Sequence, residues 1–451
     1  MAFTPERILG ELVHNAKVAS KENGRGWRRL LAPDRLIYGL LLVAAGLRIA
    51  AIYNKGIMYD GNFVDAIRFM DSARELAASG RFTYAGSDLS AYQMPGFSAF
   101  LSLFVLTAGT PLAQQLFIKS TFLLMSIASV YLLFLLGRRI GGPWVGLVAC
   151  TFLTFSMPNI YTGLLVLSEN PFSLAVIALT LLVIRLGDAP GWKCFVAALA
   201  VFVAALYLRQ AALMLLPPAI VYLWLRRYPR RLLVQQALTA AVIIVAVLTP
   251  WWFRNYQVFD TFVPFTSFEG APLLEGTFQR FHPIDSGAFA RMGELTEGFQ
   301  GNELEKGRIF ANAARQRVAQ RWRTDPADLI FTYAIGKPAA TWLLPHYWDT
   351  VLGASSYWVL RIHALVSAFG LLALLLLSVR SRARYEFMFM GLCVLLITFG
   401  TIYYLGLHRY VYPFMPFLYV AIAYSLIRLL SRALGFRHLT PLDAKPPYPV
   451  G

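Results

Sequence analysis

Ionisable and polar side chains stand at the ends of the long apolar runs of this sequence, on alternate connections. They are Asp60, Asp65, Tyr92, Glu169, Arg209, Arg254, Asn255, His408 and Arg409. A charged group at a membrane border is costly, so each is a functional candidate. The guanidinium group of arginine is planar, stays charged and binds phosphate oxygens in pairs. A carboxylate can remove the proton of a hydroxyl group. Together these residue types favour a reaction between a phosphate-bearing lipid and a hydroxyl acceptor.

Each candidate also has a structural explanation. Asp65 is placed to cap a helix, and Glu169 could form a structural bridge with Arg209. A lone arginine at a membrane border more often extends toward lipid headgroups than into a site. His408 alone makes no metal site. The sequence contains no P-loop, GxGxxG motif or nucleophile elbow, and we predict neither a cofactor nor a metal.

The composition is that of an integral membrane protein. Of the 451 residues, 57% are hydrophobic and only 14% are charged, whereas soluble domains are about 25% charged. The net charge of +17 comes from Lys and Arg clusters that flank the apolar runs. This positive-inside pattern excludes the nucleic-acid binding that a continuous basic stripe would indicate. The three cysteines lie in apolar runs, so no disulfide framework is expected.

Apolar runs of about 20 residues predict transmembrane helices. The candidates are 36–53, 115–136, 143–165, 170–186, 193–208, 211–225, 233–252, 362–379, 387–406 and 411–430. Two further runs, 95–109 and 328–345, contain Gly and Pro and are left out of the count. The inside segments then hold 22 Lys and Arg against 7 Asp and Glu, and the remainder holds 19 against 17. We predict an all-α polytopic bundle of about ten transmembrane helices with both termini cytoplasmic.

The predicted chain has five parts. They are a basic N-terminus (1–35), an N-terminal transmembrane module (36–252) that includes an outer loop (54–114), an outer loop with helices (253–361), C-terminal transmembrane helices (362–430) and a cytoplasmic tail (431–451). Apolar residues recur at helical spacing over 66–77, which predicts an amphipathic helix on the membrane surface. A second outer helix is expected over about 302–323.

The order of several short motifs resembles the GT-C superfamily of integral-membrane glycosyltransferases, specifically the branch of protein O-mannosyltransferases and aminoarabinose transferases. The motifs are Asp65, Phe69, Ala73-Arg74 and Gly80; Pro95-Gly96; Ser168-Glu169; Arg209-Gln210, where relatives have Arg-Pro; Pro250-Trp251 with Arg254-Asn255-Tyr256; and Arg409-Tyr410 with Pro413. The similar features run from about residue 36 to 425. This chain departs from its relatives at Ala66, where many have Glu or Ser, and at Phe69, where many have Tyr.

The resemblance implies an inverting glycosyltransferase that uses a polyprenyl-phosphate-linked sugar as donor. It implies that Asp65 deprotonates the acceptor hydroxyl, with Asp60 as the nearest rival for that role. The lipid phosphate would be held by three arginines and a histidine: Arg209, Arg254, Arg409 and His408. Glu169 would orient an arginine or a sugar hydroxyl, and Tyr92 and Asn255 are further candidates for substrate contacts.

The acceptor would be a hydroxyl of a lipid, glycan or protein on the periplasmic or extracellular side of a bacterial inner membrane. Two other classes of function stay open. The first is a transporter, flippase or polymerase of lipid-linked saccharides, which the absence of an internal repeat disfavours. The second is a scaffold that binds such lipids without chemistry.

Overall fold

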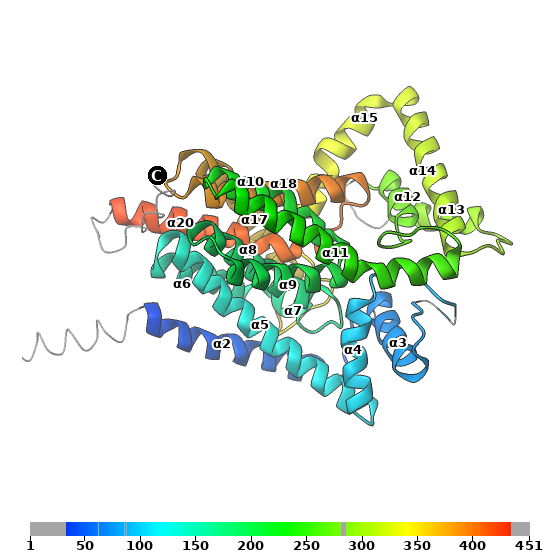
Figure 1. Ribbon diagram of the computed structural model, residues 1–451, viewed down its shortest axis with the longest axis horizontal. Helices are drawn as coiled ribbons and strands as arrows, with labels where there is room; N and C mark the ends of the chain where they lie inside the picture. The colour runs from blue at the N-terminus through cyan, green and yellow to red at the C-terminus, as the bar shows by residue number, and fades with distance from the viewer. Residues whose placement is uncertain (1–32, 62, 85, 87, 281–285, 434–451) are drawn as a thin grey trace, which may run out of the picture.

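The computed structural model describes residues 33–61, 63–84, 86, 88–280 and 286–433 (Figure 1). The predicted N-terminal part and tail therefore lie almost entirely outside the described residues. Within the described part the chain is helical, and its only β feature is an isolated bridge between Thr83 and Leu89. The predicted all-α fold is confirmed.

Seven helical segments of the described chain are long and apolar enough to cross a membrane. They are α2 (Pro33–Lys55), α5 (Pro111–Gly141), α8 (Glu169–Asp188), α11 (Arg230–Phe259), α17 (Ser356–Arg380), α18 (Arg384–Tyr403) and the continuous segment His408–Ala433. That last segment comprises α19 (His408–Val411), the short turn Tyr412–Phe414 and α20 (Met415–Ala433). These segments coincide with seven of the ten predicted spans.

The other three predicted spans form shorter helices. They are α6 (Pro143–Phe155) with α7 (Met157–Thr162), α9 (Trp192–Leu208), and the segment Gln210–Leu225, which consists of a 3-10 turn and α10 (Leu216–Leu225). The short helix α4 (Gly96–Thr107) covers the excluded run 95–109 and lies across the long helices (Figure 1). Its 12 residues span about 18 Å, which is too short to cross a bilayer.

Two helix breaks place site residues at one end of the bundle. The hydroxyl of Ser156 caps α7 and interrupts the run 143–165, and an irregular stretch then leads to Glu169 in the first turn of α8. Arg209 has extended backbone angles at the end of α9, between two apolar segments. Both breaks occur where the sequence changes from apolar to polar, so helix ends present charged side chains at the outer border.

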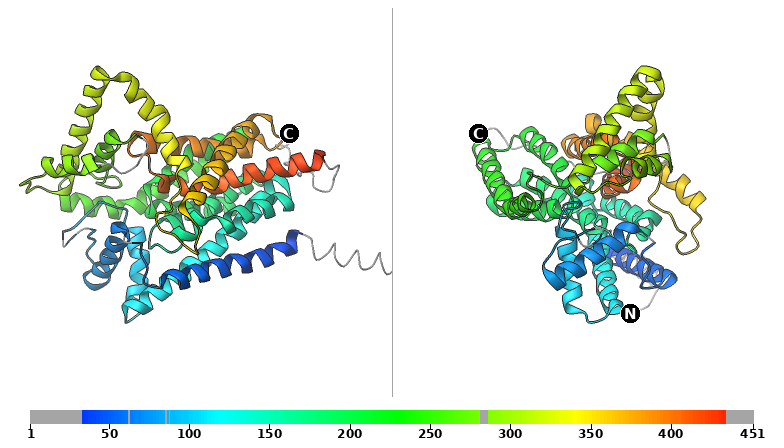
Figure 2. Two further views of the ribbon diagram at one scale, coloured as in Figure 1. Left: turned by 180° about the vertical axis from the view of Figure 1, so that it is seen from behind. Right: turned by 90° about the vertical axis from the view of Figure 1, so that its right-hand side faces the viewer.

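The outer segments gather at the same end of the molecule (Figure 2). The predicted amphipathic helix is α3 (Val64–Ser79), which packs on α4 through Phe69. The predicted helix near 302–323 is α14 (Glu303–Thr324), which begins with a capping box at Asn302. It packs on α12 (Gly270–Phe278) and is joined to α13 (Ser286–Leu295), α15 (Pro326–Phe331) and α16 (Lys337–Leu343).

The opposite end of the bundle carries a buried ion network. Arg139 and Arg226 both pair with Asp188, and Arg226 Nη1 also lies 3.7 Å from Glu386 Oε1. This network ties α5, α8, α10 and α18 together. Near the same end, α5 and α6 touch at Gly137, where an added Cβ would lie 2.7 Å from Gly146 Cα. These contacts hold the helices closely together at this end of the bundle.

Candidate active site

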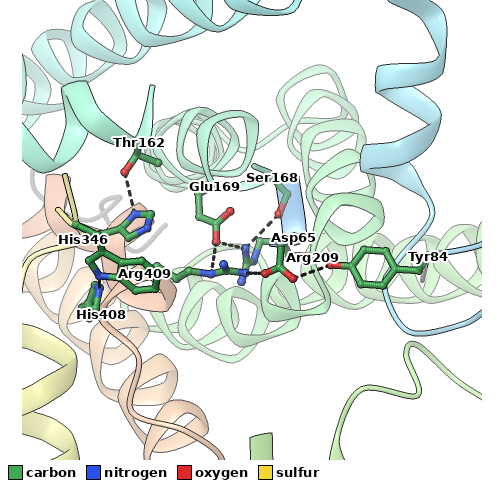
Figure 3. Close-up of polar contacts among 10 residues, drawn as sticks. Asp65, Tyr84, Thr162, Ser168, Glu169, Arg209, His346, His408 and Arg409 are labelled. Carbon is green, nitrogen blue, oxygen red and sulfur yellow. Dashed lines mark hydrogen bonds and ion pairs between the residues drawn. The ribbon is translucent and has the colours of Figure 1, made fainter. Parts of the chain in front are cut away.

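Four charged residues from four different segments meet at the outer end of the bundle (Figure 3). Arg409 Nη2 donates to Asp65 Oδ2 at 2.6 Å, and Arg409 Nε lies 3.0 Å from Glu169 Oε1. Arg209 Nη1 lies 2.7 Å from the same Glu169 oxygen. The contacts to Glu169 are ion pairs without aligned hydrogen-bond geometry. The array therefore runs Asp65–Arg409–Glu169–Arg209 and contains two positive and two negative groups.

Local structure supports each charge in this array. Asp65 lies in the first turn of α3 and Glu169 in the first turn of α8, where the helix dipole favours a carboxylate. Glu169 is fully buried, and its two arginines supply the opposite charges that a buried carboxylate requires. Arg209 also donates to Ser168 Oγ at 3.1 Å and lies over the ring of Tyr410. The predicted pairing of Glu169 with Arg209 is thus present, and Arg409 joins it.

Asp65 is the accessible end of the array. Its side chain is 27% exposed, against 10% for Arg409 and 0% for Glu169. Burial acts to raise the pKa of Asp65, but the charge and hydrogen bond of Arg409 and the hydroxyl of Tyr84 outweigh it and lower the pKa below the ordinary value. Tyr84 donates to Asp65 Oδ1 at 2.9 Å. Asp65 is therefore an ionised carboxylate that an incoming group can reach.

A cavity of about 330 Å³ opens beside the two arginines. Its polar lining includes Arg209, Arg409, Ser168, Gln210, Thr266, Glu269 and Tyr404, and its apolar lining includes Phe69, Leu213, Met214, Phe265 and Ile397. The apolar residues Leu213, Met214 and Ile397 come from the 3-10 turn after Arg209 and from α18, which are parts of the bundle. The cavity thus joins a charged end to an apolar wall, an arrangement that suits a ligand with a polar head and an apolar tail.

The remaining predicted residues lie around the array without joining it. Tyr92 stacks on Tyr84 with ring centroids 5.1 Å apart. Asp60 lies ahead of α3 and interacts electrostatically with Lys119. His408 precedes Arg409, and its ring accepts from Trp348 Nε1 at 2.9 Å.

Arg254 and Asn255 support a loop near the site. Arg254 donates to the carbonyl oxygens of Ser90 at 2.7 Å and Phe82 at 2.9 Å, and to Asn255 Oδ1. Asn255 is fully buried and donates to the carbonyl of Val263. These contacts hold the segment that carries Tyr84 and Tyr92. None of them is to a member of the charged array, so Arg254 supports this segment and is not part of the array.

Sequence reasoning missed several groups that face the site. Tyr84 lies in a loop without a motif, and His346 lies in the stretch between α16 and α17. Glu269, which lines the cavity, and Glu275 come from the second outer loop on α12 and its cap. No local pattern distinguishes them, because only tertiary packing brings the second outer loop to the first. Among the described residues no group of three or more His, Cys, Asp or Glu is arranged to hold a metal ion.

Glu275 makes the stability of the folded protein depend on pH. Burial, and then the charge of Asp65, raise the pKa of Glu275 from 4.5 to about 7. A pKa raised by folding means that this group contributes its stability below the unfolded value near 4.5 and loses it as the pH rises through 7. We expect Glu275→Gln, which is always neutral, to unfold at a higher temperature than the wild type at pH 8 and at the same temperature at pH 4.

Thermal unfolding of the purified protein in nanodiscs at both pH values measures this difference. Glu294→Gln is the matched control, because the Glu294 carboxylate is 63% exposed and pairs with Arg291 on the surface. It should show no gain at pH 8 relative to pH 4. An equal effect of Glu275→Gln at the two pH values would contradict the assignment.

Part of this chain matches the model of a known protein family. Residues 93–253 match the family model described as dolichyl-phosphate-mannose-protein mannosyltransferase, and this segment contains Glu169 and Arg209. No curated protein matches the chain significantly in sequence.

Solved structures extend the comparison to nearly the whole chain. The oligosaccharyltransferase of Archaeoglobus fulgidus, tethered with an acceptor peptide containing the NVT sequon, superposes with a TM-score of 0.53 at 11% identity over 90% of this chain and 51% of that chain. Its apo form gives 0.53 at 12% identity over 88% and 52%. ArnT from Cupriavidus metallidurans bound to undecaprenyl phosphate gives 0.38 at 13% identity over 91% and 81%. The chain spans about half the length of the oligosaccharyltransferase that it matches.

The superposition on the oligosaccharyltransferase shows that this chain shares its fold, and the predicted resemblance to the GT-C superfamily is confirmed at the level of the fold. The match to the mannosyltransferase model lies within residues 93–253, which is less than half of the chain.

Proposed function

We propose that this protein is an inverting glycosyltransferase that moves a monosaccharide from a polyprenyl-phosphate donor to a hydroxyl acceptor on the outer face of a bacterial inner membrane. The array Asp65–Arg409–Glu169–Arg209 carries the proposal. It combines an accessible carboxylate, Asp65, with two guanidinium groups that line a cavity with an apolar wall. A general base and a phosphate site are the two parts that this reaction requires.

The donor lies in the 330 Å³ cavity. Its phosphate is held by Arg209 and Arg409, and the first isoprene units lie along Leu213, Met214 and Ile397. The sugar faces the polar residues contributed by the second outer loop, among them Thr266 and Glu269. An arginine pair stabilises a phosphate better as it becomes a leaving group, because the charge on its oxygens increases in the transition state.

In the reaction, Asp65 accepts the proton of the acceptor hydroxyl. The acceptor oxygen forms a bond to the anomeric carbon while the bond from that carbon to the phosphate oxygen breaks. The electron pair of the broken bond remains on polyprenyl phosphate. Attack from the face opposite the phosphate inverts the anomeric configuration.

Donor binding also activates the base. In the free protein Arg409 pairs with Asp65 and lowers the pKa of its carboxyl, which makes Asp65 a weak base. A donor phosphate competes with Asp65 for the same guanidinium group. As Arg409 turns toward the phosphate, Asp65 loses its strongest counter-charge and becomes more basic. Deprotonation of the acceptor thus follows donor binding.

The charge distribution supports an outer location for the reaction. The buried network of Arg139, Asp188, Arg226 and Glu386 and the basic connections lie at the opposite end of the long helices from the proposed site. Under the positive-inside pattern that end is cytoplasmic. The proposed acceptor is a lipid, glycan or protein that reaches Asp65 from the aqueous side.

A transfer assay tests this function. The purified protein in nanodiscs is incubated with a panel of polyprenyl-phosphate sugars and an extract of envelope glycolipids and glycans. We expect release of polyprenyl phosphate that depends on the acceptor, with a product of inverted anomeric configuration by NMR. Binding of the donors without cleavage, together with their movement across a proteoliposome membrane, would instead support a flippase.

A further inference from the structure

A second, very small cavity is lined in part by His408, the residue before Arg409. It has a volume of about 10 Å³ and is lined by Ser156, Pro158, His346, His363, His408 and Tyr412, among others. His346 and His408 are 2% and 5% exposed, and their ring centroids are 5.6 Å apart. Two ring nitrogens, His346 Nε2 and His408 Nδ1, are buried without a hydrogen-bond partner in the described part of the chain. Buried polar atoms of this kind require an explanation.

The neighbours of His408 determine its tautomer. Trp348 Nε1 lies 2.9 Å from His408 Nε2, and an indole nitrogen is only a donor. His408 Nε2 must therefore accept. In a neutral imidazole the other nitrogen then carries the proton, so the unpartnered His408 Nδ1 is an N–H donor.

The tautomer of His346 follows from the same reasoning. Its Nδ1 lies 3.1 Å from Thr162 Oγ1, and the Thr162 hydroxyl already donates its proton to the carbonyl of Pro158 at 2.8 Å. His346 Nδ1–H must therefore be the donor to Thr162. Burial, and then the charges of Arg409 and Arg209, lower the pKa of His346 to about 3, which keeps the ring neutral. The unpartnered His346 Nε2 is thus an acceptor.

We propose that one ordered water molecule occupies this cavity and links the two histidines. The donor His408 Nδ1–H and the acceptor His346 Nε2 border a space the size of one water molecule. A buried water needs both hydrogen-bond donors and acceptors around it. Ser156 Oγ accepts from Asn159 N and from the Tyr419 hydroxyl, so its own proton provides a third bond to the water. The water accepts from His408 and Ser156 and donates to His346.

A metal ion does not fit the same space. Coordination by His408 Nδ1 would require that nitrogen to be unprotonated, whereas Trp348 selects the opposite tautomer. His363 has its ring nitrogens bonded to the Ser367 hydroxyl and the backbone of Trp342. The cavity therefore offers two donors, on His408 and Ser156, and one acceptor, on His346, which is a pattern that suits water.

The completed chain runs from Trp348 through His408, the water, His346 and Thr162 to the carbonyl of Pro158. It contains or contacts residues that lie within two positions of Asp65, Glu169 and Arg409 in the sequence. His408 precedes Arg409. The Thr162 carbonyl accepts from Asn170, next to Glu169, at 3.1 Å. The rings of Trp348 and Phe63 are stacked with their centroids 4.6 Å apart, and Phe63 is the N-cap residue of α3, the helix that contains Asp65.

We therefore assign a positioning role to His346, His408 and Thr162. Through the water, they hold Asp65, Glu169 and Arg409 in their relative positions. The existence of the water chain is independent of the reaction, whereas its catalytic consequence rests on the function proposed above.

The first test reads the tautomers and the water directly. The full-length protein labelled with ¹⁵N-histidine is measured in nanodiscs at pH 7 without substrate. We expect His346 and His408 both to be neutral and protonated at Nδ1, and the His408 N–H to show a cross-peak to a bound water. A proton on His346 Nε2, a metal-bound nitrogen or a cavity without water would each overturn the proposal.

The second test uses Thr162→Val, which keeps the side-chain shape and removes the acceptor of His346 Nδ1–H. We expect the His346 proton to move to Nε2 and kcat to fall about fivefold, the effect of one lost hydrogen bond. The control is Thr180→Val, because Thr180 is equally buried but bonds only to Val176 in its own helix. A wild-type rate with Thr162→Val would overturn the positioning role. A wild-type protein that shows the expected tautomers but no transfer would contradict only the proposed function.

Discussion

Asp65→Asn should lower kcat for sugar transfer by about a thousandfold or more, the range expected for loss of a general base. Asparagine has nearly the same shape as aspartate, and its amide oxygen can still accept from Tyr84 or Arg409. It cannot take the acceptor proton at neutral pH. The affinity for the sugar donor should be unchanged or higher, because the variant frees Arg409 from its ion pair with Asp65. Steady-state transfer and donor binding by the purified variant measure the two effects.

Asp349→Asn is the matched control for this variant. Asp349 also lies on an outer connection, pairs with a cation, Lys55, at 2.7 Å and accepts from the hydroxyl of Tyr59 at 2.7 Å. Its partners, Lys55 and Tyr59, are not members of the charged array. It should therefore lose some local stability and keep its transfer rate. A folded Asp65→Asn protein with a rate within tenfold of the wild type would contradict the role of Asp65 as base, and Asp60→Asn would then be the variant to examine.

Arg409→Lys should reduce kcat/KM about a hundredfold or more. The guanidinium group reaches Asp65 through Nη2 and Glu169 through Nε at the same time. A lysine ammonium is a point charge and lacks the planar fork that lets Arg409 keep Nε near Glu169 while its Nη2 pairs with either Asp65 or a phosphate. Both the donor Kd and kcat should therefore change, because Arg409 binds the phosphate and also controls the basicity of Asp65.

The control for a general loss of a buried ion pair is Arg226→Lys. Arg226 is 3% exposed and bridges Asp188 and Glu386 at the other end of the bundle. We expect it to destabilise the protein to a similar extent and to leave kcat and donor affinity of the folded fraction unchanged. Equal activity losses in Arg409→Lys and Arg226→Lys would indicate that Arg409 only supports the fold.

The sequence predicted the helical architecture well because apolar runs and charge clusters are local signals. It made Glu169, Arg209 and Arg409 candidates because they stand at the ends of apolar runs, and Asp65 because it begins an amphipathic helix in an outer loop. The predicted spans 143–165, 193–208 and 211–225 proved to be shorter helices. The first is interrupted where Ser156 caps a new helix, and the second and third are separated by the extended backbone of Arg209.

The rest of the site depends on contacts between segments far apart in the chain. Arg409 meets Asp65 across 344 positions, and Trp348 meets His408 across 60. Periodicity cannot indicate which loop carboxylate an arginine will reach. Arg254 also stands at the end of an apolar run, so the sequence does not distinguish it from the residues of the array. Only its hydrogen bonds to the carbonyls of Phe82 and Ser90 do so.

The most direct test is a single-turnover experiment on donor that is already bound. Wild-type protein and Asp65→Asn are saturated with a polyprenyl-phosphate sugar in nanodiscs, mixed with acceptor and quenched over time. We predict that both proteins bind the donor, that the wild type converts it to polyprenyl phosphate and an inverted glycoside in one burst, and that Asp65→Asn shows no burst. A burst of wild-type amplitude and rate from Asp65→Asn would contradict the proposed mechanism.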